Sequence, residues 1–145
     1  MSLKKIKLIV EKHSEEDVEK AKEEHYGQEA IFDIHNVASD KYDVKSIGEF
    51  AKKLAQEIGM KTGPSYHWGT KGEFNSEPDL PVKADGISHV QFIYESSITI
   101  HALDKISKVY VNIFSCKDFD AEKAKEFTMD WFGGDLVKFR NIVRE

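Results

Sequence analysis

Several features that define whole classes of proteins are missing from this chain of 145 residues. The single cysteine, Cys116, excludes an intrachain disulfide and a cysteine-rich zinc cluster. No apolar run approaches the roughly 20 residues that a membrane-spanning helix needs, and the lysine-rich start lacks the apolar core of a signal peptide. We therefore expect a cytoplasmic protein that is not associated with a membrane.

An excess of positive charge is also missing. The chain has 21 Lys and Arg residues against 26 Asp and Glu residues, a net charge of -5, and the two signs alternate along the sequence. This pattern argues against a nucleic-acid partner. The six histidines show no ligand spacing such as His-Glu-x-x-His, so we predict no metal site.

The hydrophobic content of 40% suits one domain with a single core, covering residues 1–145. Residues 1–27 resemble an N-terminal extension of that domain. Within them "KKIKLIVEK" alternates weakly, as a short strand does, and "SEEDVEKAKEEHYG" predicts a charged helix capped by Ser14 and ended by Gly27.

The next part of the chain predicts a strand, a helix and a long loop. Alternate residues of "EAIFDIHN" are apolar, which indicates a strand with Phe32 on its apolar face. The apolar residues that follow recur at helical spacing until Gly59, where a helix C-cap is expected. Residues 61–86 hold all three prolines, so we expect a long loop there with at most one short strand.

From Ile87 onward three β runs follow one another closely: "ISHVQFIY", "SITIHAL" and "KVYVNIFSC". Short connections predict an antiparallel meander. A helix ended by Gly133 and Gly134 comes next, and "DLVKFRNIV" adds a strand or a helical turn. This order predicts an α+β fold, a two-layer sandwich with one antiparallel sheet and helices on one face. The other face needs a cover, which a second copy in a homodimer would supply.

The first turn of the meander brings a serine near a histidine. A turn at residues 95–96 places Val90 opposite His101, with Ser88 diagonal to His101 on the same face. Taken alone, a histidine on a polar strand face, such as His101, is more often structural than catalytic, and Ser88 carries almost no signal.

The second turn, over residues 104–107, places Cys116 opposite Glu95 and beside Ser96. Taken alone, Ser96 is explained by turn chemistry and Cys116 by burial as a small apolar residue. Ser96 and His101 are separated by five extended residues, about 16 Å at roughly 3.3 Å each, so the two pairs should not meet in one chain. Sheet-to-sheet packing in a two-fold dimer would bring them together.

The segment "GISHVQFIYESSITIHALDKISKVYVNIFSCKDFDAEKA" resembles the prokaryotic S-adenosylmethionine decarboxylase family. Here "ESSITIH" stands where the family has Glu-Ser-His-Leu-Thr-Ile-His, and "IFSCKDFDAEKA" stands where it has a Phe-Thr-Cys-Gly turn before a helix. Four residues coincide at the family's spacing: Ser88, Ser96, His101 and Cys116. The resemblance implies an αββα dimer and an enzyme of polyamine biosynthesis, on the route to spermidine.

The resemblance also implies that the chain is a zymogen. In the family the hydroxyl at the position of Ser96 attacks the carbonyl of the preceding residue, here Glu95, at a strained turn. Autocatalytic cleavage then converts Ser96 into a pyruvoyl group, with Ser88 and His101 assisting. The pyruvoyl carbonyl forms a Schiff base with the substrate amine and withdraws electrons as CO2 leaves, and Cys116 returns a proton to the carbanion.

The chain departs from the family at the positions that bind the nucleoside. Lys105 stands where an acidic residue holds the ribose hydroxyls, and a lysine donates hydrogen bonds but accepts none. Val82 stands where an aromatic residue stacks on adenine. The other candidates for stacking on adenine are Phe32, Trp68 and Phe74.

Three functions therefore agree with the sequence. The first is decarboxylation of S-adenosylmethionine, with Lys105 and Phe32 at the substrate. The second is decarboxylation of a smaller amine-bearing acid such as arginine or ornithine, which needs no adenine site. The third is a homologue that is not processed and keeps the dimeric fold as a binding or regulatory protein.

Overall fold

The computed structural model of the chain describes residues 12–69 and 79–145. The strand predicted in "KKIKLIVEK", apart from its last residue Lys12, and the stacking candidate Phe74 lie outside the described residues. The elements in chain order are α2 (Glu15–Glu23), β1 (Gly27–His35), η1 (Ser39–Lys41), α3 (Val44–Glu57), β2 (Thr62–Trp68), η2 (Val82–Ala84), β3 (Ile87–Ile93), β4 (Ser96–Leu103), η3 (Asp104–Ile106), β5 (Lys108–Ser115), α4 (Ala121–Phe132) and β6 (Asp135–Arg144).

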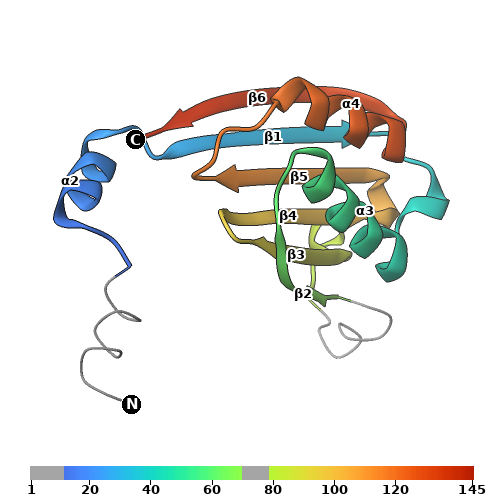
Figure 1. Cartoon of the computed structure of the whole chain (residues 1–145). Coiled ribbons are helices and arrows are strands. Elements are labelled where there is room, and N and C mark those ends of the chain that lie inside the picture. Colours follow the sequence, from blue (N-terminus) through green and yellow to red (C-terminus); the bar gives the residue numbers. More distant parts are fainter. Residues whose placement is uncertain (1–11, 70–78) are drawn as a thin grey trace, which may run out of the picture.

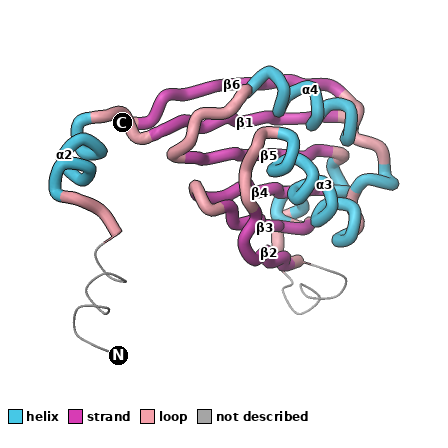
Figure 2. The backbone as a smooth tube through the Cα atoms, viewed as in Figure 1, coloured by secondary structure: helices cyan, strands magenta, loops and turns pink. Residues whose placement is uncertain are grey.

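The six strands form one sheet in the order β2-β3-β4-β5-β1-β6, with antiparallel pairing throughout (Figure 1). Helices α3 and α4 pack on one face of this sheet (Figure 2). The predicted α+β sandwich with helices on a single face is confirmed. We call the sheet face that α3 and α4 leave uncovered the open face.

Helix α3 packs on the sheet through one apolar stripe. The Asp43 side chain accepts a hydrogen bond from the Ser46 backbone N–H, which caps the first turn. The predicted C-terminal glycine, Gly59, follows the helix with a φ of 75°, a value that costs glycine little. The residues that α3 buries lie on one stripe: Ile47, Phe50, Ala51, Leu54 and Ala55.

Phe32 of β1 is part of the core and not of a ligand site. It has no exposed surface, and its ring stacks on Phe139 of β6 with ring centroids 5.3 Å apart. Alternate residues of β1 point toward the helices, and Phe32 lies among these. The expectation that Phe32 stacks on a substrate is therefore wrong for this chain, because the ring is already enclosed by protein.

Truncating Phe32 should destabilise the fold strongly. We expect Phe32→Ala to lower the free energy of unfolding by about 3–5 kcal/mol, because it removes a large buried ring and leaves a cavity. Chemical denaturation with two-state analysis measures this loss. Phe92→Ala is the matched control, since the same ring stands 42% exposed on β3. A similar loss in both variants would contradict the assignment of Phe32 to the core.

The N-terminal helix ends earlier than its sequence suggests. Ser14 and Asp17 form a capping box at its start, as the Ser14 cap predicts, but α2 ends at Glu23 and Gly27 begins β1. The glycine serves a close approach of strands and not a helix end, because a Cβ on it would lie 2.0 Å from the Ser115 carbonyl oxygen. Helix α2 buries none of its residues and stands beside the sheet (Figure 1).

The sheet ends in two edge strands, β2 and β6, whose secondary structure the sequence did not decide. The one short strand allowed in the 61–86 loop is β2, which pairs with β3. The final segment "DLVKFRNIV" is strand and not helix, and as β6 it pairs with β1. No helix in the described part of the chain is long and apolar enough to cross a membrane.

Candidate active site

The hairpin between β3 and β4 has a register that differs by two residues from the expected one. Its turn consists of Tyr94 and Glu95, and Ser96 is already paired with Ile93 as the first residue of β4. Ser88 consequently lies directly opposite His101 and not diagonal to it. Ser96 has a φ of 157°, which is close to extended backbone and does not by itself indicate strain.

Ser88 and His101 are in contact on the open face. Ser88 Oγ and His101 Nδ1 share a hydrogen bond of 3.0 Å. Both side chains line a hollow of about 490 Å³, together with Trp68 of β2 and with Tyr110 and Asp33 on the neighbouring strands. A hollow of this size is in the range of small-molecule sites. The predicted proximity of Ser88 and His101 is confirmed, and their role stays a prediction.

Cys116 and Glu95 meet at the opposite end of the strands. The Cys116 backbone N–H donates a hydrogen bond to the Glu95 carbonyl oxygen, with an N–O distance of 3.2 Å. The placement of Cys116 opposite Glu95 is therefore confirmed. Ser96 pairs with Ser115, the residue before the cysteine. The thiol of Cys116 is free and exposed, so burial as a small apolar residue does not explain this cysteine.

The turn after β5 holds Cys116 in place through the buried side chain of Ser115. The Ser115 hydroxyl donates to the Lys117 carbonyl oxygen at 2.8 Å and accepts from the Lys117 backbone N–H at 2.9 Å. The Lys117 ammonium in turn donates to the carbonyl oxygen of Gly59, which follows the C-terminal end of α3. These contacts fix the backbone on both sides of Cys116 while its thiol stays accessible.

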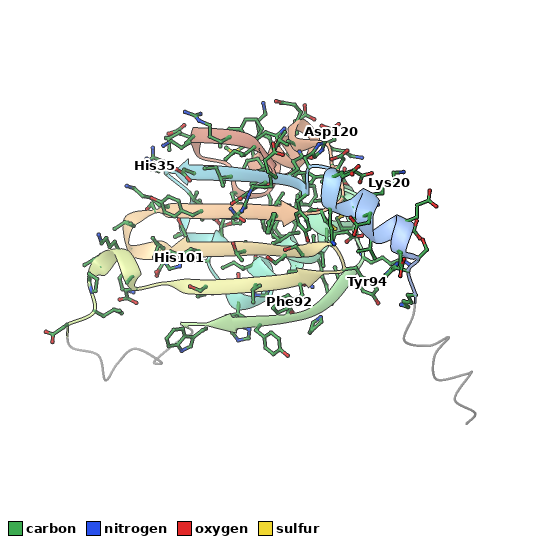
Figure 3. All side chains as sticks on the ribbon, turned by 90° about the vertical axis from the view of Figure 1, so that its left-hand side faces the viewer. Lys20, His35, Phe92, Tyr94, His101 and Asp120 are labelled. Carbon is green, nitrogen blue, oxygen red and sulfur yellow. The ribbon has the colours of Figure 1, made fainter. Side chains whose placement is uncertain are left out.

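The two pairs occupy separate places in one chain. The residues that line the hollow around Ser88 and His101 include neither Ser96 nor Cys116. Figure 3 shows His101 near one end of the sheet and Tyr94, the neighbour of Glu95, at the other. The strand-length argument for this separation holds, because Ser96 and His101 belong to the same strand.

Lys105 is held by carboxylates and not directed at either pair. Its ammonium lies 3.0 Å from an Asp85 carboxylate oxygen and 3.8 Å from an Asp104 carboxylate oxygen, on the exposed turn η3. The hydrogen bond with Asp85 is the main reason that the pKa of Lys105 is raised. A substrate that used Lys105 would therefore have to compete with Asp85.

A buried histidine, His89, with the exposed His67 beside it is the feature that sequence reasoning missed. His89 of β3 is only 5% exposed, and neither of its ring nitrogens has a hydrogen-bond partner among the described residues. Its ring is parallel to that of His67 on β2, with centroids 6.5 Å apart. The alternation of "ISHVQFIY" places His89 on the same strand face as two buried residues, Gln91 and Ile93, and that signal could have identified it.

Acid should weaken the fold through His89. Burial, and secondly the neighbouring His67, lower the pKa of His89. Below about pH 6.5 the unfolded chain then binds a proton that the folded chain does not, so stability falls as the pH falls toward the folded pKa. His89→Leu should flatten this dependence in urea unfolding between about pH 5 and 7.5. The exposed His13→Ala should leave it unchanged, and an unaltered slope in His89→Leu would refute the assignment.

Comparison with known proteins connects these two pairs to a family. The sequence profile of S-adenosylmethionine decarboxylase matches residues 28–145, which run from β1 through β6. The chain belongs to the S-adenosylmethionine decarboxylase family. Members are decarboxylases, and the match covers Ser88, Ser96, His101 and Cys116. It begins after α2, so the N-terminal extension lies outside it.

A solved structure supports the same fold. The crystal structure of the adenosylmethionine decarboxylase from Aquifex aeolicus VF5 is similar to this chain with a TM-score of 0.59 and 18% sequence identity. The similarity covers 81% of this chain and 88% of the Aquifex chain. No curated protein matched the sequence. At this level of identity the likeness establishes the S-adenosylmethionine decarboxylase fold.

Proposed function

We propose that this family member is a self-processing, pyruvoyl-dependent decarboxylase that cleaves itself between Glu95 and Ser96. The observation that supports this most directly is the hydrogen bond from the Cys116 backbone N–H to the Glu95 carbonyl oxygen. That oxygen is the one on which negative charge develops when the Ser96 hydroxyl attacks. A fixed backbone donor at that position stabilises such an oxyanion.

The reaction begins with bond exchange within the chain. The Ser96 oxygen adds to the Glu95 carbonyl carbon, and the peptide C–N bond breaks to give an ester and a free Ser96 amine. Loss of the Ser96 α-proton then expels the Glu95 carboxylate and separates the two fragments. Water adds to the resulting enamine and ammonia leaves, so the new N-terminus is a pyruvoyl group. Each of these steps moves protons, for which an imidazole is well suited.

The residues around Ser96 fit the group that this reaction creates. When formed, the pyruvoyl group supplies a carbonyl that withdraws electrons from a bound amine. The exposed Cys116 lies next to the Ser96 pairing partner Ser115 and can donate a proton to the carbon that has lost CO2. The described residues hold no group of three side chains suited to a metal ion.

The proposal includes a homodimer in which the open faces pack together. Ser88 and His101 of one protomer would then lie beside Ser96 and Cys116 of its partner, which one chain alone does not achieve. Exposed aromatic side chains on or beside this face favour an interface of this kind. They are Tyr66, Trp68, Phe92 and Tyr94.

The substrate we propose is S-adenosylmethionine, decarboxylated for spermidine synthesis. The family supports this choice, whereas the nucleoside positions favour arginine or ornithine as the alternative. Val82 is exposed but has no ring to stack on adenine, and Lys105 is occupied by Asp85. Release of CO2, measured separately with S-adenosylmethionine, arginine and ornithine, identifies which of the three is the substrate.

The intact mass of the freshly purified protein, repeated after a day at physiological temperature, tests self-processing. We expect fragments 1–95 and 96–145, the second with a blocked N-terminus. A second candidate function is that of an unprocessed dimer that serves as a binding protein. It is favoured by the regular pairing of Ser96 with Ile93 on β3 and with Ser115 on β5. A single chain that persists unchanged would overturn the self-processing decarboxylase and favour the unprocessed dimer.

A further inference from the structure

Strand β2 is held to the sheet on one side only. It forms an edge of the sheet and pairs with β3 alone (Figure 1). None of its seven residues is buried, and a shift of register between Thr62 and Ser65 interrupts its ladder with β3. Weakly buried edge segments of this kind open locally at a lower free energy than the whole domain unfolds. Strand β2 is therefore a candidate for local opening.

The two parts of β2 are attached differently. Gln91 Nε2 donates to the Gly63 carbonyl oxygen at 2.9 Å, and the Tyr94 backbone N–H donates to the Lys61 carbonyl oxygen at 3.0 Å. These contacts anchor the start of the strand. Beyond the shift of register, residues 65–68 are exposed and pair with β3. The second part of β2 can therefore open while the first part stays in place.

A buried imidazole lies under this second part. His89 of β3 is 5% exposed, and neither of its ring nitrogens has a hydrogen-bond partner among the described residues. A neutral imidazole carries one N–H donor, and a buried donor without a partner loses the hydrogen bond that water would supply. Contact of water with this ring is therefore favourable, and it is more so when the ring carries a charge.

Three elements cover the His89 ring. Strand β2 contributes His67, which stands opposite His89 with a parallel ring at a centroid distance of 6.5 Å. Helix α3 contributes Gly48, where a Cβ would lie 3.8 Å from His89 Cε1, and on the other side β4 places Ile100 opposite His89. The charged residues within four positions of Gly48 on α3 are exposed: Lys45, Glu49 and Lys52. Among the described residues, His67 is thus the titratable group that acts on His89.

Acid favours the open form of β2. Burial, and secondly His67, lower the pKa of His89, so the closed form resists taking up a proton. Helix α3 is anchored by its stripe of buried residues and β4 lies inside the sheet, which leaves β2 as the cover that opens most easily. Once β2 is open, water reaches the ring and its pKa returns to about 6.5. Because only the open form then gains a proton as the pH falls, the ratio of open to closed molecules rises about tenfold between pH 7.5 and pH 5.5.

The opening of β2 alters the hollow around Ser88 and His101. Tyr66 and Trp68 line this hollow from β2, and Trp68 lies opposite Ser88 in the β2–β3 ladder. When residues 65–68 leave β3, the hollow loses both aromatic side chains at once. The buried histidine on one face of the sheet is thereby coupled to the hollow on the other face.

We propose that residues 65–68 form an acid-sensitive wall of this hollow, seated on β3 while His89 is neutral and released when His89 takes up a proton. The inference rests on the proposed function only for what the hollow does, because Ser88 and His101 assist self-cleavage there. The release itself is a property of the fold and takes place equally in a chain that never cleaves. Acid thus opens the site from the β2 side without unfolding the domain.

Hydrogen exchange followed by mass spectrometry tests the release. The full chain carries Ser96→Ala so that it stays whole, and labelling times are scaled to the intrinsic exchange rates at pH 7.5 and pH 5.5. We expect the protection of the amides of residues 65–68 to fall about tenfold at the lower pH. This protection should not respond to low concentrations of urea, because a local opening exposes little surface.

Strand β6 is the matched control within the same chain. It is the other edge strand, it has no buried residue either, and it lies at the far side of the sheet from His89. Its protection should change by less than about twofold between the two pH values. An equal loss of protection in β2 and β6 would show a general effect of acid and would contradict a release specific to β2.

Variants assign the effect to His89. His89→Leu should keep β2 protected and abolish the difference between the two pH values, whereas His13→Ala removes an exposed histidine and should leave the difference unchanged. If the leucine variant does not fold, His89→Gln takes its place, because glutamine does not titrate either. Equal protection of β2 at both pH values in the starting chain, or a difference that survives the loss of His89, would overturn the proposal. Failure of self-cleavage appears separately, in the intact mass of the original chain, and leaves this measurement untouched.

Discussion

Ser96→Ala is expected to remain a single chain at every time point and to show no decarboxylase activity. The substitution removes the only hydroxyl that can attack the Glu95 carbonyl from the adjacent residue, and with it the source of the pyruvoyl group. Ser96 is a partly exposed residue at the start of β4, so the loss of one oxygen should leave the fold intact. Intact mass follows the cleavage, and release of CO2 follows the activity.

Ser97→Ala is the matched control for this experiment. Ser97 is the next residue of β4, is similarly exposed and pairs with Phe92 on β3. Its hydroxyl is one residue too far along the chain to attack Glu95, so cleavage should proceed within about threefold of the original rate. Equal loss of cleavage in both variants would place the chemistry elsewhere, and cleavage of the Ser96→Ala chain would exclude the mechanism.

Much of the fold could be predicted because its periodicities are strong. The apolar residues at helical spacing before Gly59 correspond to α3, and the three runs after Ile87 correspond to β3, β4 and β5. The hairpin register was off by two residues because the turn lacks the glycine or asparagine that identifies a two-residue turn. Tyr94 and Glu95 form it instead, and only the observed pairing of Ile93 with Ser96 reveals this.

The candidate site was predictable only in its local part. Ser88 with His101, and Glu95 with Cys116, follow from neighbouring strands of one meander, where register alone decides proximity. Phe32 could not be assigned to a ligand or to the core from alternation, because either face of a strand can be buried. The contacts of Tyr26 with Phe114 and Arg144 could not be predicted, because they depend on β1 pairing with both β5 and β6, which are distant from it in the sequence.

Mixing two inactive variants should restore cleavage if the site is shared between protomers. A Ser96→Ala chain still carries His101, and a His101→Ala chain still carries Ser96 and Cys116. In a heterodimer packed open face to open face, one of the two sites would then combine every residue of the original site, while the other would lack both Ser96 and His101. Each variant alone should stay uncleaved, because its sites lack either the nucleophile or the imidazole.

The identity of the cleaved chain makes this experiment decisive. After the two variants are unfolded together and refolded in equal amounts, random pairing puts about half of the His101→Ala chains into heterodimers. Intact mass should show that fraction as fragments 1–95 and 96–145 bearing the alanine at position 101, with the Ser96→Ala chain always whole. No cleavage in the mixture, with normal cleavage of the original protein treated in the same way, would exclude a site shared between Ser96 of one protomer and His101 of the other. His101 would then have to act without contacting Ser96, since the strand that separates the two residues within a protomer cannot bend to join them.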